Sequence, residues 1–341
     1  MNILIIKTTS LGDVIHALPA VEDATRAIPG ITFDWVVEAP FQEIPRFHPA
    51  VKNVIPVRVR HWRKNLFSKD TWREIFAAVK AIRAKKYDKV IDAQGLIKSG
   101  LLTGLARGET AGFSKTCARE PLSSYFYQQT VSVDPKDHAI TRIRALFAGI
   151  LGYTVDSNEM HYGLAAVEKI KNEKPTLVLL HGTTWPTKHW PEIYWIALAK
   201  LAHAQGYDVL VSWGNEIERI RAEKIAEGGN ATVLPKMSLT QLAVILKSAT
   251  GVVAGDTGLG HLAAALDVPC LSLYGPSDPK RTGAWGRHVK YMTSNRPCAP
   301  CFSQTCLISD MRAPTDPPCL GDFTPEIVFS QLQSLLMEHA S

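Results

Sequence analysis

Short apolar runs alternate with amphipathic stretches through the first half of the chain. The segment after Asp13 and residues 139–151 are predicted as helices, as are residues 72–83, where apolar side chains recur at helical spacing. The predicted strands are NILII, TFDWVV and KVIDA, residues 2–6, 32–37 and 89–93. This alternation indicates βα units and therefore a mostly parallel sheet.

The alternation restarts after a polar stretch at residues 163–175, which indicates a domain boundary. The strands predicted beyond it are TLVLLH, DVLVSW, GVVAGD and PCLSLYG, residues 176–181, 208–213, 251–256 and 269–275. A helix over 193–206 is expected to end in a left-handed cap at Gly206. We predict two α/β domains, residues 1–165 and 166–341, with a cleft between the loops at the carboxyl ends of their strands.

The composition is that of a globular protein with two cores of ordinary size: 341 residues, 46% hydrophobic and 21% charged. No window of the sequence approaches the roughly 18 uncharged apolar residues of a membrane span. No positively charged segment precedes a long apolar stretch at the start of the chain. We therefore expect a cytoplasmic protein.

Part of the net charge of +6 is concentrated in residues 58–73, where aromatic residues are interleaved with cations. The cations are Arg58, Arg60, Arg63, Lys64, Lys69 and Arg73, and the aromatic residues are Trp62, Phe67 and Trp72. Such a segment fits an anionic membrane surface or a phosphorylated lipid. A solvated basic loop explains it equally well. No nucleic-acid-binding motif surrounds it, so no nucleic-acid partner is expected.

The motif TTSLGD, residues 8–13, lies between a predicted strand and a helix. Gly12 permits a tight turn, and the unpaired amides of a helix N-terminus attract anions. Asp13 is open to two interpretations, an N-cap that stabilises the helix or a base that takes a proton from a hydroxyl.

The motif HGTTWPTKHWPE, residues 181–192, precedes a helix that we expect to begin at Pro191. Thr183 and Thr184 supply directional hydroxyl donors, and Lys188 supplies positive charge. This combination suits a diphosphate.

The motif GDTGLGHLAAALDVP, residues 255–269, leads from a strand into an Ala-rich helix. Its glycines allow backbone amides to approach phosphate oxygens, and the helix dipole favours the charge of a leaving diphosphate. The spacing matches neither a P-loop nor a dinucleotide fingerprint. The residues concerned are Asp256, Thr257, Gly258, Gly260 and His261, of which His261 could equally be structural.

Four of the six cysteines fall within a short segment, residues 297–319. Cys298, Cys301, Cys306 and Cys319 are spaced as CxxC followed by gaps of four and twelve residues. A structural Zn site and free structural thiols are the two interpretations, since a disulfide framework is not expected in the cytosol. Neither makes these cysteines catalytic.

Several motifs in order give the chain a family resemblance. They are TTSLGDVIHALPA, WRK, DAQGLIKS, AREPLS, TTWPTKHWP, LPKMSL and DTGLGHLAAALDVP followed by LYGPSDP. Together they resemble the bacterial lipopolysaccharide heptosyltransferases, and most strongly the type I members. The likeness runs from Asn2 to about Pro279.

The resemblance implies a GT-B fold, with two Rossmann-like domains that face each other across a cleft. The first domain would bind the acceptor and the second the sugar nucleotide. The implied reaction transfers L-glycero-D-manno-heptose from ADP-heptose to the first 3-deoxy-octulosonate (Kdo) of lipid A, inverting the anomeric centre. The implied partners are ADP-heptose, Kdo-lipid A and the cytoplasmic face of the inner membrane, where the protein would bind peripherally. No catalytic cofactor is expected.

The resemblance also implies roles for individual residues. Asp13 matches the catalytic base. Thr183, Thr184, Lys188, Thr257, Gly258 and His261 match residues at the diphosphate, Asp256 one at the heptose, Glu218 one at the ribose and Met237 one at the adenine. The acceptor-facing cations would be Arg60, Arg63, Lys64 and Arg119.

Other functions stay open on the sequence alone. The segment 297–319 resembles the tail of other members of the wider family, including heptosyltransferase II, so an enzyme that adds the next core heptose is an alternative. A sugar-nucleotide epimerase of the same architecture would need acid and base groups around the donor sugar, for which Asp256 and His261 are the candidates. The third alternative, ranked last, is a non-catalytic protein that binds anions or nucleic acid through the basic segment and the cysteine cluster.

Overall fold

The computed structural model describes residues 1–157 and 159–340. The chain forms two compact units, unit 1 spanning Met1–Ala166 and unit 2 beginning at Val167. Each unit contains a six-stranded sheet in which every described pair of neighbouring strands is parallel. The predicted α/β class is confirmed.

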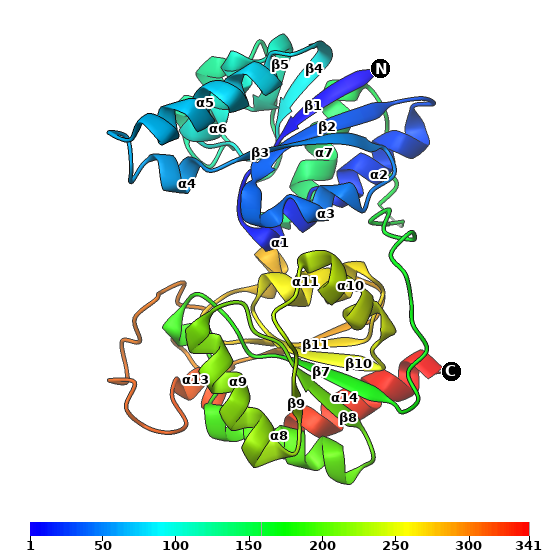
Figure 1. Ribbon diagram of the computed structural model, residues 1–341, viewed down its shortest axis with the longest axis vertical. Helices are drawn as coiled ribbons and strands as arrows, with labels where there is room; N and C mark the ends of the chain where they lie inside the picture. The colour runs from blue at the N-terminus through cyan, green and yellow to red at the C-terminus, as the bar shows by residue number, and fades with distance from the viewer. Residues whose placement is uncertain (158, 341) are drawn as a thin grey trace. The chain divides into compact units, whose positions relative to one another are not determined.

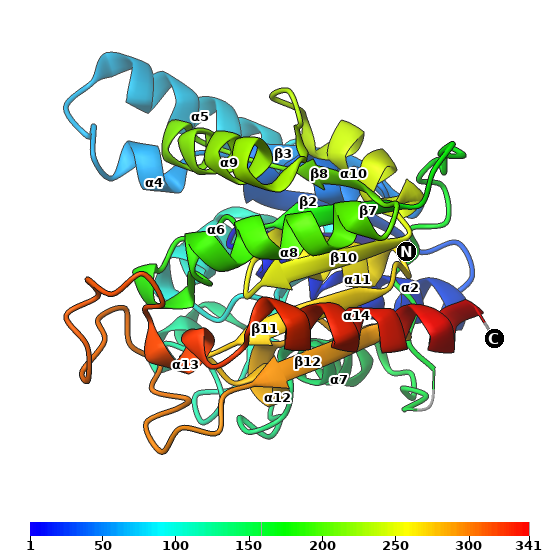
Figure 2. The same cartoon turned by 90° about the horizontal axis from the view of Figure 1, so that it is seen from below.

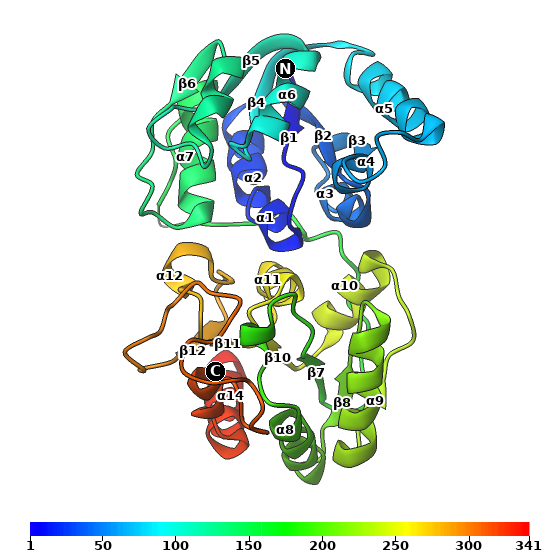
Figure 3. The same cartoon turned by 90° about the vertical axis from the view of Figure 1, so that its left-hand side faces the viewer.

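The sheet of unit 1 has the strand order β3-β2-β1-β4-β5-β6, and in Figure 3 the labels run from β6 on the left to β3 on the right. The order reverses between β1 and β4, which is the switch point where open α/β sheets bind ligands. The strands are β1 Asn2–Ile6, β2 Thr32–Glu38, β3 Val51–Val57, β4 Lys86–Asp92, β5 Arg107–Phe113 and β6 Gln129–Val131.

Helices cover both faces of this sheet. Successive side chains of β1 point to opposite faces, and because residues 3–6 are all buried, both faces must be covered. Leu4 and Ile6 pack with Ile82 of α5, and Phe33 lies 6.5 Å from Phe147 of α7 between ring centroids. Figure 1 shows α5 and α6 on one side and α2 and α7 on the other. The helices are α1 Leu11–Ile15, α2 Leu18–Ala27, α3 Glu43–Arg46, α4 Val59–Trp62, α5 Lys69–Ile82, α6 Ile97–Leu105 and α7 Ala139–Leu151, with 3-10 turns η1 Ala39–Phe41 and η2 Pro121–Phe126.

Unit 2 repeats the topology with the order β9-β8-β7-β10-β11-β12, so its switch point lies between β7 and β10. The strands are β7 Thr176–Leu180, β8 Asp208–Val211, β9 Thr232–Val233, β10 Gly251–Gly255, β11 Cys270–Tyr274 and β12 Val289–Thr293. The helices are α8 Glu192–Ala204, α9 Glu216–Gly229, α10 Leu239–Ser248, α11 Gly258–Ala265, α12 Pro279–Thr282, α13 Pro318–Gly321 and α14 Pro325–Ala340, with the 3-10 turn η3 Pro186–Lys188.

A tryptophan pair anchors the last helix of unit 2. Trp190 and Trp195 meet edge to face at 4.9 Å between ring centroids, and Trp190 Nε1 donates to Phe323 O at 2.9 Å. Val328 and Leu332 of α14 join the same buried cluster. Figure 2 shows α8 and α14 in front of the strands of this sheet. Burial of these large side chains fixes α14 against the sheet.

The regular elements agree with the sequence prediction best where the apolar pattern is strong. The strand at 2–6 and the helix at 139–151 have the predicted bounds, and Gly206 has the predicted left-handed conformation with φ of 84°. The helix expected at Trp72 begins at Lys69, because Ser68 is its N-cap. Pro191 is the N-cap of α8 and not its first residue, so that expectation is wrong by one position. Within the described residues, no helix is both long enough and apolar enough to span a bilayer.

Candidate functional site

Asp13 lies on α1, in the turn that follows β1 at the switch point of unit 1. Ser10 is the N-cap, and its backbone amide and hydroxyl donate to Asp13 Oδ2 at 2.7 and 3.0 Å. The N-cap interpretation of Asp13 is therefore wrong, because Asp13 is the third helical residue and its side chain reaches back to the cap. Both bonds end on Oδ2, so Ser10 leaves the other carboxylate oxygen, Oδ1, without a hydrogen bond from the cap.

Lys7, which the sequence analysis did not single out, lies beneath this carboxylate. Its ammonium is 3.9 Å from Asp13 Oδ1 and donates to Ala93 O at 3.0 Å. The Lys7 side chain is 6% exposed and that of Asp13 32%. Burial lowers the pKa of Lys7, while the charges of Asp13 and Asp92 oppose that shift. Unit 1 therefore presents a carboxylate to solvent and keeps the matching cation inside.

The loop after β4 braces the loop after β1. Gln94 Oε1 accepts from the amides of Thr8 and Thr9 at 3.0 and 3.2 Å, and Gln94 Nε2 donates to Thr9 O at 2.8 Å. Asp92 is fully buried and accepts from Tyr127 OH at 2.6 Å and from the Gln94 amide at 2.7 Å. Burial raises the pKa of Asp92 against these hydrogen bonds. The two loops form one hydrogen-bonded unit at the switch point.

The structure relates three of the four predicted acceptor-facing cations to these loops. Burial lowers the pKa of Lys98, whose ammonium lies 3.5 Å from Thr9 Oγ1, and the nearby charges of Arg60 and Arg63 add to that shift. The pKa of Lys7 is lowered mainly by burial, and the charge of Arg119 contributes to the same shift. Glu120, the neighbour of Arg119, accepts a hydrogen bond from the Ile97 amide at 2.6 Å.

Lys64 is exposed near the end of α4, and no described contact ties its side chain to this group. Lys98 is an additional cation that the motif DAQGLIKS contained but that was not assigned a role.

Lys188 and Asp256 form an ion pair at the switch point of unit 2. Lys188 Nζ is 2.6 Å from Asp256 Oδ2, and the two side chains are 17% and 10% exposed. Ser277 Oγ donates to the same oxygen at 2.5 Å. The Lys188 ammonium also lies 4.3 Å from the centre of the Trp185 ring, within range of a cation–π interaction. The sequence placed both residues in loops but did not reveal their pairing.

Hydroxyl groups and a helix N-terminus surround this ion pair. Thr183 Oγ1 donates to Asp256 O at 3.2 Å, and Thr184 is exposed in the same loop. Thr257 is the N-cap of α11, which begins at Gly258. The first amides of any helix lack intrahelical acceptors and carry partial positive charge. The arrangement can therefore hold a diphosphate.

Gly260 and His261 take part in the packing of α11, which the motif did not indicate. A Cβ at Gly260 would lie 3.1 Å from the Ala254 Cβ, so glycine lets α11 pack closely on β10. His261 is buried in the same helix, with 6% of its surface exposed. Packing against β10 is thus one reason for glycine at position 260, and the expected approach of its amide to phosphate stays a prediction.

Glu218 lies in the first turn of α9, after β8. Its carboxylate accepts from the Gly214 amide at 2.8 Å, and its own amide donates to the Asn215 N-cap. A Cβ on Gly182 would come within 2.7 Å of that carboxylate, so the loops after β7 and β8 touch here. Met237 is half-buried just before α10, in the loop after β9. The candidate residues of unit 2 thus lie in the loops that follow β10, β7, β8 and β9, which are neighbouring strands of the sheet.

Two histidines behind the Lys188 loop were not predicted. Arg221 Nη1 donates to His189 Nδ1 at 2.5 Å, and His181 is 2% exposed at the end of β7. Burial lowers the pKa of each histidine to about 4, and the charge of Arg221 adds to the shift. Both imidazoles are neutral at neutral pH. Their environment depends on contacts made by the folded chain, so sequence offered no signal for it.

Cys298, Cys301, Cys306 and Cys319 line one small cavity of unit 2. All four are free thiols. Within the described residues, no three Cys, His, Asp or Glu side chains are grouped so that they could hold a metal ion. A preformed Zn site, one of the two interpretations of the spacing, is therefore not seen in this structure.

The comparisons with known proteins agree with this geometry. The family model of glycosyltransferase family 9 (heptosyltransferase) matches residues 75–311. Lipopolysaccharide heptosyltransferase 1 of Pseudomonas aeruginosa is 47% identical, covering 99% of this chain and 98% of that protein. The solved structure of E. coli heptosyltransferase WaaC with ADP is 41% identical, with a TM-score of 0.88 over 98% of this chain and all of that one. Its complex with ADP-2-deoxy-2-fluoro heptose gives 0.86, at the same identity, over 98% and 99%.

The fold and the loops at both switch points define a glycosyltransferase with the GT-B fold, two Rossmann-like units in one chain. The chain belongs to glycosyltransferase family 9, the heptosyltransferases. The family and the fold that the sequence motifs implied are confirmed.

Proposed function

We propose that the protein transfers L-glycero-D-manno-heptose from ADP-heptose to the first Kdo of lipid A in lipopolysaccharide biosynthesis, with inversion at the anomeric carbon. The full-length similarity to lipopolysaccharide heptosyltransferase 1 and to a structure solved with an ADP-heptose analogue supports this reaction. The observation that carries the proposal is the division of charge between the units. Asp13 is a partly exposed carboxylate at the switch point of unit 1, and Lys188 with α11 forms an anion-binding loop in unit 2.

Asp13 is proposed as the base. A sugar hydroxyl becomes an effective nucleophile when its proton leaves as the new bond forms. Ser10 holds Oδ2 with two hydrogen bonds, so Oδ1 is the oxygen that takes the acceptor proton. The Lys7 ammonium lies 3.9 Å from Oδ1 and helps to hold the carboxylate in place.

The diphosphate is proposed to bind where the Lys188–Asp256 pair now lies. The residues involved are Thr183, Thr184, Lys188, Thr257, Gly258 and His261. The ammonium and the amides of the α11 N-terminus stabilise the charge that develops on departing ADP. Asp256 then contacts the heptose hydroxyls. Because the chain supplies this charge, the scheme requires no catalytic cofactor.

The nucleoside is proposed to lie along the loops that follow β8 and β9. Glu218 accepts hydrogen bonds from the ribose hydroxyls, and Met237 packs against the adenine. The order of these loops fits an extended nucleotide, because β7, β8 and β9 are adjacent strands and the phosphates bind at the β7–β10 switch point.

Unit 1 is proposed to bind the acidic acceptor through Arg60, Arg63, Lys64 and Arg119. Next to Arg63 and Lys64 is an exposed aromatic group of Phe67, Trp72 and Phe76. Trp72 and Phe76 lie 6.1 Å apart between ring centroids, on one side of α5. Exposed aromatics beside cations bind anionic bilayers. We therefore propose peripheral binding at the cytoplasmic face of the inner membrane.

Vesicle sedimentation tests this membrane proposal. Wild-type protein should bind phosphatidylglycerol vesicles in a salt-dependent manner, and the variant Phe67→Ser/Phe76→Ser should bind at least several-fold more weakly. Ile217→Ser, which removes an equally exposed apolar side chain from unit 2, is the control. Equal binding by all three proteins would contradict the proposed surface.

The reaction itself is tested by measuring ADP release from ADP-heptose with two acceptors, Kdo-lipid A and the same lipid already carrying one heptose. The proposal predicts release with Kdo-lipid A and a product heavier by one heptose. Activity only with the heptosylated acceptor would identify a type II enzyme instead. Conversion of ADP-heptose to an isomer without acceptor would identify an epimerase.

A further inference from the structure

The segment between β12 and α13, residues 294–317, has no helix or strand although it belongs to a compact unit. Its apolar side chains contribute little burial, since Phe302, Leu307 and Ile308 are all exposed. Loops of this length without secondary structure are uncommon unless they are functional or held by another interaction. The four cysteines are the feature of this loop that could hold it.

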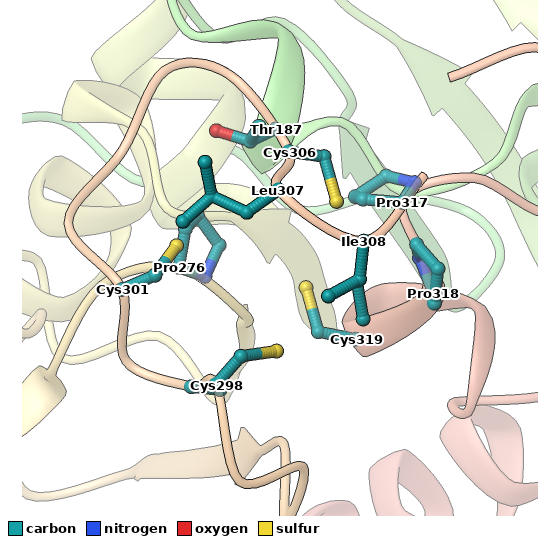
Figure 4. A pocket seen from close by; sticks show the side chains of 11 residues that line it. Thr187, Pro276, Cys298, Cys301, Cys306, Leu307, Ile308, Pro317, Pro318 and Cys319 are labelled. Atoms are coloured by element: carbon teal, nitrogen blue, oxygen red, sulfur yellow. The ribbon is translucent and has the colours of Figure 1, made fainter. Parts of the chain in front are cut away.

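The cysteine cavity gathers thiols from three stretches of chain. Figure 4 shows the sulfurs of Cys298, Cys306 and Cys319 pointing into one space, with Cys301 at its rim beside Pro276. The cavity has a volume of about 30 Å³, enough for one or two water-sized occupants. The two remaining cysteines lie elsewhere, Cys117 in unit 1 and Cys270 buried in β11.

The two ends of the cysteine loop are already clamped together. Arg296 forms a two-pronged interaction with Asp322, with Nε and Nη2 donating at 2.6 and 2.7 Å to the two carboxylate oxygens. Because Arg296 precedes Cys298 and Asp322 follows Cys319, this clamp holds the first and last cysteines of the group near each other. A Cβ on Gly275 would lie 2.7 Å from Cys319 Sγ, so that thiol is also held against the turn after β11.

The middle of the loop is fixed to the donor-side loops. Thr187 Oγ1 donates to Ser303 O at 2.6 Å, and the Phe302 amide donates to Pro276 O at 2.7 Å. These bonds hold the chain between Cys301 and Cys306. Thr187 directly precedes Lys188 and Pro276 directly precedes Ser277, so the cysteine loop contacts the supports of the Lys188–Asp256 pair.

We propose that the cavity binds one thiophilic divalent cation through the thiolates of Cys298, Cys301, Cys306 and Cys319, and that the loop tightens by small shifts to complete the site. Four sulfur ligands are the set that structural zinc prefers, with metal–sulfur distances of about 2.3 Å. The thiols line the cavity but are not yet grouped at that spacing, so binding must contract the loop. Each thiol that binds loses a proton to solvent, so uptake releases protons.

The loop contacts give this site a structural purpose. Contraction around a cation would reduce the freedom of residues 302–306 and, through Thr187 and Pro276, of the turns that carry Lys188 and Ser277. The cation would not touch substrate. Its role would be to order the loop.

Cobalt titration of the intact, reduced and metal-free protein tests the site without any substrate. Wild type should bind about one Co²⁺ per chain with sulfur-to-cobalt charge-transfer absorption, and Zn²⁺ should displace it. Cys298→Ser and Cys319→Ser should bind Co²⁺ roughly 100-fold or more weakly, because each loses a ligand. Cys117→Ser, a buried cysteine of unit 1, should bind like wild type.

A second measurement on wild-type protein avoids any effect of the variants on folding. Zn²⁺ should protect four of the six thiols from alkylation, and mass mapping should assign protection to the four loop cysteines. Absence of the charge-transfer band, or its retention in Cys298→Ser and Cys319→Ser, would overturn the proposal. A disulfide among the four with no metal uptake after reduction would also overturn it. None of these readouts depends on the heptosyl transfer, so either proposal can fail alone.

Discussion

Units 1 and 2 share one sheet topology yet arrange opposite charges differently at their switch points. In unit 1 the cation is inside and the carboxylate faces solvent, with Lys7 at 6% and Asp13 at 32% exposure. In unit 2 both partners are largely covered, and Lys188 and Asp256 are in direct contact at 2.6 Å. The same scaffold thus offers a proton acceptor in one unit and an internally compensated anion-binding loop in the other.

The difference shows that chemistry on this scaffold depends on which partner is accessible. A carboxylate held by Ser10 and Lys7 can accept a proton without losing its position. The Lys188 ammonium is paired with Asp256 before a diphosphate arrives and can then contact both, so it is not left as an isolated buried charge. Substitutions that remove one partner should therefore affect the units in different ways.

The largest expected effect is on turnover when Asp13 is neutralised. Asp13→Asn keeps an oxygen that can accept from Ser10 but cannot serve as base, so kcat should fall roughly 10²–10⁴-fold. Asp134→Asn, which also removes an exposed carboxylate that accepts a backbone amide in unit 1, should have no effect. Steady-state ADP release measures both, and a fully active Asp13→Asn variant would eliminate the proposed base.

A smaller effect is expected when the cation of unit 2 is removed. Lys188→Ala should weaken ADP-heptose binding roughly 10- to 100-fold, because a charge-assisted contact is lost and Asp256 then repels the diphosphate. The double variant Lys188→Ala/Asp256→Asn should recover part of the affinity for ADP, the nucleotide product. If the double variant binds ADP no better than Lys188→Ala, the pair does not control access of the anion.

Removal of Lys7, the buried cation of unit 1, tests the same comparison in the other unit. Lys7→Met should lower kcat roughly tenfold and leave ADP affinity unchanged, with partial rescue in Lys7→Arg. Lys52→Met is the control, since Lys52 also donates to a backbone carbonyl in unit 1 but is exposed. A change in ADP affinity, or loss of stability without any change in kcat, would argue against a positioning role.

The last prediction concerns the pH dependence of stability, to which two buried histidines of unit 2 contribute. His181 and His189 have pKa values lowered to about 4 from 6.5, so the unfolded chain binds more protons between those pH values. The contribution of these two histidines to stability is therefore complete above pH 6.5 and is lost as pH drops toward 4, by up to about 3 kcal/mol for each histidine. Denaturant unfolding of wild type, His189→Gln and the exposed control His203→Gln at several pH values measures this. An unchanged slope in His189→Gln would exclude that histidine as a cause.

Sequence reasoning located the loops but not their internal partners. Asp13 and Lys188 lie in the connections that follow predicted strands, and Asp256 ends another, so the alternating pattern was strong enough to place these loops. Gln94 was missed because its contacts join residues more than 80 positions apart, as does the bond of Lys7 to Ala93, and local patterns do not reveal such contacts. Short or partly exposed strands such as β9 and β12 were missed because they lack a continuous apolar run.

The roles of small residues also required the folded chain. Ser10 could be identified as the cap only once α1 was seen to begin at Leu11. Gly260 in a glycine-rich motif suggested phosphate binding, and only the folded chain showed that it also packs closely against Ala254 of β10. The spacing of Cys298 and Cys301 indicated a group of cysteines, and the loop contacts then brought all four to one cavity.

The division of labour between the units is tested most directly by calorimetric titration of ADP into Asp13→Asn and Lys188→Ala. The account predicts that Asp13→Asn binds ADP with wild-type affinity while Lys188→Ala binds it roughly 10- to 100-fold more weakly. Loss of ADP affinity in Asp13→Asn, or wild-type affinity in Lys188→Ala, would contradict the assignment of the base to unit 1 and of the nucleotide to unit 2.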